Sequence, residues 1–330
     1  MLTRRENLME VMNGGNPDRF VKQYEPFATF MPSPLGKRNP APKPGELNVV
    51  NGWGVTRSWP EGMPGAFPVH TPDKIVCPDV TRWKEFVKGP DVIFTEEEWA
   101  PFVEATKAVD RKDQFVTQVI VPGVFEQCHY LMEIQNTLIN FYEEPEAMHD
   151  LIDYLVDWEL KLAEQYCKFI KPDAILHHDD WGSQISTFIS PDMFEEFFLD
   201  GYKKIYGYYK SHGVEVIIHH SDSYAATLVP FMIEMGIDIW QGVMTTNNIP
   251  ELIQKYGKDI TFMGGIDSGV IDREDWSQEV IAREVRRACT ECGTKYFIPS
   301  ASQGLPISTY KGVYEATDAE IDKMSAEMFK

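Results

Sequence analysis

The sequence has little of what would place the chain in a membrane or on nucleic acid. Its apolar residues make up 43% of 330, yet they nowhere form the run of about 18 that a membrane-spanning helix needs. Basic residues are outnumbered, with 31 lysines and arginines against 51 aspartates and glutamates, and the formal net charge is −20. This excess of negative charge argues against binding to nucleic-acid phosphates and to anionic membrane surfaces.

Cysteine is also scarce. Five cysteines are scattered along the chain, and such an odd, sparse set fits a reducing cytosol better than a disulfide framework. The N-terminal residues lack the apolar run of a signal peptide, so we expect a cytoplasmic protein. Cys289 and Cys292 form an isolated Cys-x-x-Cys pair, which without a second pair is weak evidence for a metal or redox site.

A third absence concerns the fold. No strand is followed by the Gly-x-Gly-x-x-Gly turn of a dinucleotide-binding sheet. Strand and helix patterns instead alternate regularly from residue 114, which favours a (β/α)8 TIM barrel formed by residues 1–330 as one domain. A helix at 3–12 and a weak strand at 20–23 precede it in an N-terminal extension. The predicted later strands are 115–122, 174–176, 214–218, 237–241, 260–264 and 296–298, with helices at 124–142, 145–170, from 191, 224–235, 248–256 and 276–290.

Residues 31–75 interrupt this regularity. The segment is rich in proline and glycine and contains aromatic residues, including Trp53. Long irregular segments within compact domains are often lids or binding loops. We expect an insertion near the site, and its alternative is a mobile excursion without a role in binding.

Polar residues follow the predicted strands and point to a site. The strand at 214–218 runs into His219-His220-Ser221-Asp222, and the strand at 174–176 runs into His177-His178-Asp179-Asp180-Trp181. The carboxyl ends of parallel strands meet on one rim of a barrel, where barrel enzymes keep their catalytic groups. We therefore expect one shared pocket.

His220 and Asp222 are two residues apart, so in extended geometry they point the same way. Imidazole and carboxylate both bind Zn²⁺, and a catalytic zinc uses three protein ligands. The third is open between Asp180, His178 and Ser300. The alternative is a metal-free pair in which Asp222 orients His220 for proton transfer. His177 and His219 alternate with these residues and are expected to face away.

Further strand-end residues are candidate substrate contacts. Polar contacts are expected from His178, Gln241, Asp267 and Ser300, and an apolar wall from Trp181 and Trp53. Asp180 is expected to act with His220 and Asp222 in catalysis.

The order of these elements resembles the uroporphyrinogen decarboxylase superfamily, which includes corrinoid-dependent methyltransferases. The resemblance extends from about residue 115 to the C-terminus, and it implies a (β/α)8 barrel with its site at the strand ends. It depends on short motifs in a fixed order: Gly123-Val-Phe-Glu126, Asp179-Asp180-Trp181-Gly182, Ile189-Ser-Pro-Asp-Met-Phe-Glu-Glu-Phe197, His220-Ser-Asp222, Gly264-Gly-Ile-Asp267 and Ile298-Pro-Ser300.

Two departures narrow what the resemblance implies. The decarboxylase branch begins with a motif whose arginines hold substrate carboxylates, but the corresponding segment Tyr24–Ser33 contains no arginine. The methyltransferase branch binds zinc through a His-x-Cys pair and a later cysteine. Here the histidine falls at His220, whereas Asp222 and Ser300 or Ala301 replace the cysteines. Without soft thiolates the site is harder and more Lewis-acidic, which argues against a thiol as methyl acceptor.

The resemblance therefore implies an O-demethylase-type methyltransferase. Such an enzyme moves a methyl group from a small methoxylated compound, a class that includes aromatic ethers, to the Co(I) corrinoid of a partner carrier protein. Zinc or a His/Asp acid pair would activate the leaving oxygen. Two alternatives stay open: a metal-independent decarboxylase of a small carboxylate, and a catalytically inactive corrinoid- or ligand-binding homologue.

Overall fold

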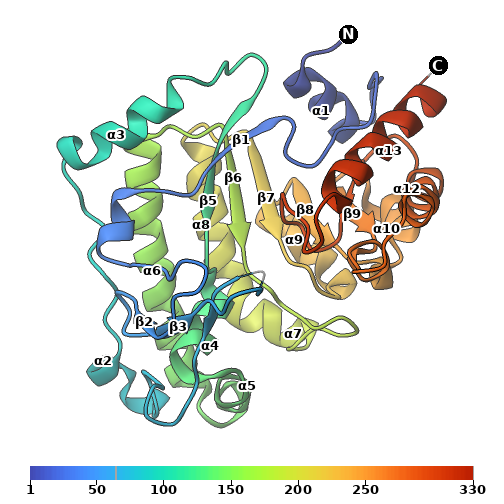
Figure 1. Ribbon diagram of the computed structural model, residues 1–330. Coiled ribbons are helices and arrows are strands. Elements are labelled where there is room, and N and C mark those ends of the chain that lie inside the picture. The colour runs from blue at the N-terminus through green and yellow to red at the C-terminus, as the bar shows by residue number, and fades with distance from the viewer. Residues whose placement is uncertain (64, 330) are drawn as a thin grey trace.

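Seven parallel strands follow one another in chain order within a single curled sheet, as the computed structural model of the protein shows for residues 1–63 and 65–329 (Figure 1). This arrangement confirms the predicted mixed α/β, TIM-barrel-like fold. The strands are β1 (Phe27–Phe30), β5 (Phe115–Ile120), β6 (Ala174–His178), β7 (Val216–His220), β8 (Ile239–Val243), β9 (Thr261–Ile266) and β10 (Phe297–Ala301).

Side chains alternate between the two faces of this sheet because a strand has a period of two residues. The inner face carries an apolar layer that includes Leu176, Ile218, Ile239 and Ile298. The opposite face packs against the surrounding helices in a second, larger core. A strand covered on both faces has a nearly continuous run of apolar residues. This is why the strands after residue 114 could be predicted from the sequence.

The N-terminal helix α1 (Arg4–Met12) lies at the amino ends of the strands, where Arg5 N donates to the Asp113 carbonyl before β5 and Tyr296 N donates to the Val11 carbonyl before β10. Leu8 and Val11 of this helix are buried in the inner apolar layer. The segments that precede β1 and follow β10 are joined by Gln23 Nε2 and the Tyr24 hydroxyl, which both donate to the Gly304 carbonyl at 2.7 Å. Within residues 1–63 and 65–329, no backbone ladder joins β10 to β1.

The outer helices cover the sheet in sequence order. They are α4 (Val124–Met132), α5 (Ile134–Glu143), α6 (Pro145–Phe169), α7 (Pro191–Phe194), α8 (Asp200–Ser211), α9 (Val229–Met235), α10 (Ile249–Tyr256), α11 (Ser268–Ile271), α12 (Gln278–Cys292) and α13 (Val313–Met328). The termini lie close together, since Phe20 and Phe329 stack edge-on with ring centroids 4.9 Å apart (Figure 1). None of the helices described is long and apolar enough to cross a membrane.

The chain between β1 and β5 does not follow the repeating pattern. It contains a small antiparallel sheet of β2 (Val49–Val50), β3 (Thr56–Ser58) and β4 (Phe67–Pro68), followed by α2 (Trp83–Phe86) and α3 (Glu96–Thr106). The predicted insertion at 31–75 is therefore partly ordered by its own strand pairs.

Two predicted elements need correction. The strand expected at 20–23 is wrong, since the first strand of the sheet lies at Phe27–Phe30. The helix expected at 124–142 is two helices, because Glu133 adopts φ 74° and interrupts the helical hydrogen bonding.

The buried face of α1 yields a stability prediction. We expect Leu8→Ala to lower the free energy of unfolding by about 2–5 kcal/mol, because it opens a cavity in the inner apolar layer. The matched control is Leu47→Ala, whose side chain is 58% exposed and whose change should stay within about 0.5 kcal/mol. Urea denaturation of both variants measures the difference, and equal losses would show that α1 does not hold the inner layer together.

Candidate functional site

Polar side chains replace the inner apolar layer at the carboxyl ends of the strands. His178 lies beyond Leu176 on the inner face of β6, and His220 lies beyond Ile218 on β7. The register pairs His178 with His220, and His220 with Gln241 of β8. Three neighbouring strands therefore present two imidazoles and an amide side by side.

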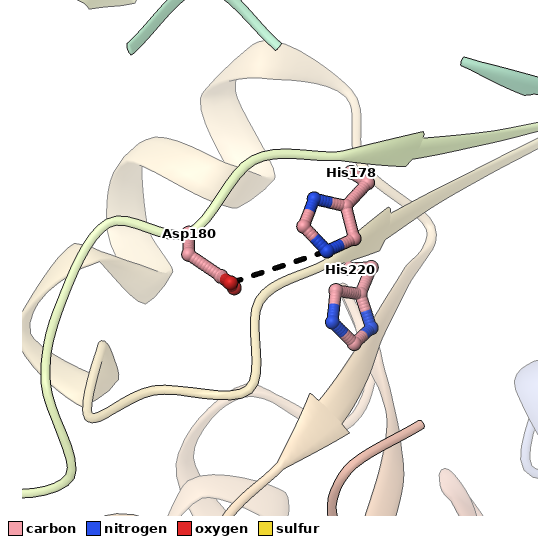
Figure 2. Close-up of side chains that lie close together, drawn as sticks. All are labelled: His178, Asp180 and His220. Atoms are coloured by element: carbon pink, nitrogen blue, oxygen red, sulfur yellow. Dashed lines mark ion pairs between the residues drawn. The ribbon is translucent and has the colours of Figure 1, made fainter. Parts of the chain in front are cut away.

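His178, Asp180 and His220 form a group that could hold a metal ion, with one ligand atom from each within 4.8 Å of the others (Figure 2). The two imidazole rings stack with centroids 4.4 Å apart, and His178 Nε2 lies 3.9 Å from Asp180 Oδ2. Ligand atoms around tetrahedral zinc are about 3.4 Å apart, so only small side-chain rotations separate this arrangement from a bound one.

Both histidines are oriented by polar partners at their other ring nitrogen. His178 Nδ1 lies 2.8 Å from Glu126 Oε2, and His220 Nδ1 is hydrogen-bonded to Gln241 Oε1. Carboxylate and amide oxygens only accept, so both Nδ1 atoms carry the proton of the hydrogen bond. Each Nε2 atom is then the ligand atom, and it binds a metal ion only in its unprotonated form. This is the arrangement that outer-shell partners impose on metal-binding histidines.

Gly304 holds Gln241 in this orientation. Its carbonyl accepts from Gln241 Nε2 at 2.8 Å, which turns the amide oxygen toward His220. Gly304 has φ 68°, and a Cβ atom there would lie 2.5 Å from Gln241 Nε2 and 2.7 Å from His220 Cε1. Only glycine allows this close approach.

The charges of the two histidines differ. Burial works against the charged form of His178, but the Glu126 carboxylate outweighs it and raises the pKa of His178 to about 10. Burial, together with the neighbouring charge of His178, lowers the pKa of His220 to about 4. His220 is 5% exposed, whereas the His178 side chain is 30% exposed and reaches the mouth of the barrel.

Asp222 lies beside this group rather than within it. Its backbone N–H donates to Asp180 Oδ1 at 3.0 Å. Burial and the nearby Asp180 carboxylate raise the pKa of Asp222 to about 8, which favours a neutral carboxyl group. The metal role that the sequence suggested for Asp222 stays a prediction, and so does its role as an acid.

The alternate histidines face outward, as their positions in the strands predict. Tyr206 of α8 hydrogen-bonds His177 Nδ1 at 2.9 Å and His219 Nδ1 at 3.0 Å. Trp181 is 1% exposed, and its ring stacks on His219 with centroids 3.8 Å apart. A substrate contact by Trp181 stays a prediction, and its burial in this outer layer does not favour one.

The buried carboxylate of Asp179 holds the start of α4 against the end of β6. Its carboxylate accepts hydrogen bonds from Phe125 N at 3.0 Å, Glu126 N at 2.7 Å and Trp181 Nε1 at 3.1 Å, and also from the Tyr202 hydroxyl. These bonds tie the start of α4, and with it Glu126, to the end of β6. Gly123 allows the close approach, because a Cβ atom there would lie 2.5 Å from Asp179 Cβ.

The remaining predicted site residues lie in three places. Ser300 is 3% exposed, its hydroxyl has no partner among the residues described, and it follows Ile298 on the inner face. Asp267 caps α11 by accepting from Gly269 N at 2.9 Å. Trp53 is 3% exposed and packs edge-on against Trp158 of α6, outside the barrel wall.

Sequence reasoning gave no role to three residues that organise this site. Glu126 and Asp179 stood only within motifs, and Gly304 was not considered. Two of them could have been noticed from their positions. Asp179 follows a predicted strand, and Glu126 lies in the first turn of a predicted helix. Hydrogen bonds between distant segments carry no periodicity, so the partner of each group could not be identified.

The chain is similar to proteins of known family and structure. The sequence model of the uroporphyrinogen decarboxylase (URO-D) family matches residues 71–316. A solved structure of a methyltransferase from Methanosarcina mazei is similar with a TM-score of 0.63 at 14% identity, covering 98% of this chain and 99% of that one. A B12-independent methionine synthase from Shewanella gives a TM-score of 0.43 at 15% identity, over 73% and 67% of the two chains. No curated protein matches the sequence.

The buried carboxylate of Asp179 yields the prediction of this section. We expect Asp179→Ala to lower the free energy of unfolding by about 3 kcal/mol or more, because it leaves buried N–H groups without acceptors. Asp153→Ala is the control, on the exposed surface of α6, with an expected change within about 0.5 kcal/mol. Thermal and urea unfolding test both, and a neutral result for Asp179→Ala would mean that other groups hold the start of α4.

Proposed function

Because the chain belongs to the uroporphyrinogen decarboxylase (URO-D) family, we propose that it is a corrinoid-dependent methyltransferase. It moves a methyl group from a small methoxylated, aromatic compound to the Co(I) corrinoid of a separate carrier protein. The observation that carries the proposal is the group of His178, Asp180 and His220 at the mouth of the barrel. Two imidazoles and a carboxylate are the donor set of a catalytic zinc, and His178 gives up its Nε2 proton when the ion binds.

In the proposed site these three residues would hold a zinc ion. When bound, the zinc ion would supply Lewis-acid chemistry for the ether oxygen. Glu126 and Gln241 keep the Nε2 atoms of the two histidines directed at the ion. The absence of thiolate ligands keeps the set hard, which suits an oxygen substrate better than a thiol.

The proposed reaction breaks the bond between the methyl carbon and the ether oxygen. Co(I) supplies the electron pair of the new cobalt–carbon bond, and the pair of the broken bond stays on the oxygen. A proton then converts this aryloxide to a phenol. Asp222 is the proposed proton donor. It lies next to Asp180, and burial near other acidic groups favours the neutral form of its carboxyl group.

Metal content tests the proposed ligand set. We expect wild-type protein, prepared without chelators, to take up about one zinc ion per chain, and His220→Ala and Asp180→Ala to lose it. Asp222→Asn should keep the ion, which distinguishes this set from a His220–Asp222 pair. His212→Ala, on the exposed end of α8, is the control. Loss of zinc in Asp222→Asn alone would overturn the assignment of Asp180 and His178.

Turnover tests the activity itself. With a reduced corrinoid carrier and a methoxylated aromatic compound, we expect methylated corrinoid and phenol in equal amounts. His220→Ala should lower the rate at least about a hundredfold without unfolding the protein, because ligands and their partners are worth this much in metal sites. Carbon dioxide release from a carboxylate, without a carrier or metal, would contradict methyl transfer and favour a decarboxylase. Ligand binding without either product would identify an inactive homologue.

A further inference from the structure

A cavity of about 460 Å³ lies beside the barrel and is not explained by the site above. Strand β5, helix α6, Phe102 of α3 and part of the segment between residues 31 and 57 line it. Its volume lies within the range of about 300–1,000 Å³ that is usual for small-molecule sites.

The cavity reaches the mouth of the barrel around the free edge of β5. The pairing of β1 with β5 ends at Phe30 and Gln118, but β5 continues to Ile120. Val119 packs against the inner apolar layer, and Leu162 of α6 lies on the outer side of the sheet, yet both line the same cavity.

The same edge places the cavity next to the proposed metal ligands. Ile120 pairs with His177, and Gly123 N donates to the His178 carbonyl at 2.7 Å, so Val121 lies in the short segment between these two contacts. Val121 also lines the cavity and is 39% exposed. A molecule held in the cavity can therefore extend one substituent toward His178.

Most of the wall is aromatic or aliphatic. Trp53 and Trp158 meet with ring centroids 4.9 Å apart and interplanar angle 62°, and Leu155 and Tyr166 continue the wall along α6. Aromatic side chains favour edge-on and offset contacts with another ring. This lining suits a planar aromatic molecule.

The charges around the cavity differ in sign from those of the whole protein. Lys37 and Arg57 line it, whereas the net charge of the chain is −20. Its one carboxylate, Glu159, lies 2.7 Å from His177 Nε2 and is compensated there. No ion pair among the described residues involves Arg57.

Two buried donors at the cavity also lack acceptors. Arg57 Nε and Gln127 Nε2 are inaccessible to solvent and have no hydrogen-bond partner in the part of the chain that the structure covers. Gln127 as a whole is 6% exposed. Buried polar groups are rarely left unpaired, and because water cannot reach these two atoms, an acceptor in the cavity pairs with them only after their side chains rotate toward it.

We infer that the cavity binds the ring and carboxylate of an aromatic carboxylate that carries a methoxy group. The ring packs between Trp53 and the apolar side chains of α6, and the carboxylate accepts hydrogen bonds from Arg57. The methoxy group then extends past Val121 toward His178. This inference rests on the proposed function, and it narrows its substrate from methoxylated aromatics to aromatic acids bound through Arg57.

Binding to the protein alone, without corrinoid carrier, tests the inference. Titration calorimetry and quenching of tryptophan fluorescence compare meta-methoxybenzoate with the uncharged meta-methoxybenzyl alcohol. We expect Arg57→Gln to weaken binding of the acid at least about tenfold and to leave the alcohol nearly unchanged. Leu35→Trp, which fills the cavity from its cover, should block both compounds.

Controls separate these effects from damage to the fold. Arg273→Gln removes an exposed arginine that pairs with Asp275, and it should bind both compounds like wild type. Arg57→Lys keeps the charge and should retain most of the preference for the acid. Unchanged melting temperatures for Arg57→Gln and Leu35→Trp confirm that the fold is intact.

The outcomes for the cavity and for the function are distinguishable. If wild type binds no aromatic acid, or if neither cavity variant alters binding, the cavity assignment is wrong even where methyl transfer is observed. If the variants weaken binding as expected but the carrier is never methylated, the cavity assignment stands and the proposed function fails. A lower KM for the acid than for the alcohol, lost in Arg57→Gln, would support both.

Discussion

The alternation of side chains along parallel strands is the constraint on which this site depends. A residue two positions beyond Leu176 or Ile218 must face the interior of the barrel, so His178 and His220 stand directly above the apolar layer. A shift of one residue would exchange them with His177 and His219, which pack against α8. The inner apolar layer and the site are therefore set by one register.

Hydrogen bonds from outside the strands complete what the register begins. An imidazole at a strand end can rotate and can carry its proton on either nitrogen. Glu126 removes this freedom for His178, and Gln241 removes it for His220. Glu126 is held in turn through Asp179, and Gln241 through Gly304, so the orientation of two rings depends on segments that are distant in sequence.

These two levels explain how much could be predicted from the sequence. The barrel-like fold, the later strands and the convergence of His178, Asp180 and His220 follow from periodicity and from polar residues at strand ends. The strand at Phe27–Phe30, the break at Glu133 and the order within 31–75 depend on tertiary contacts that override local preference. The sequence paired His220 with Asp222, whereas the group that could hold a metal ion in the structure consists of His178, Asp180 and His220.

The loss of cysteine has a positional consequence for the proposed site. In the methyltransferases that the sequence resembles, ligands come from the strand of His220 and from the last strand, where this chain has Ser300. Here the proposed ligand set comes from β6, the residues that follow it and β7, which would place the ion nearer to β5. That side is where β1 ends early and the cavity lined by Val121 and Arg57 opens. A harder donor set and a cavity suited to an aromatic acid thus occur on the same side of the barrel, as expected if both serve one oxygen-bearing substrate.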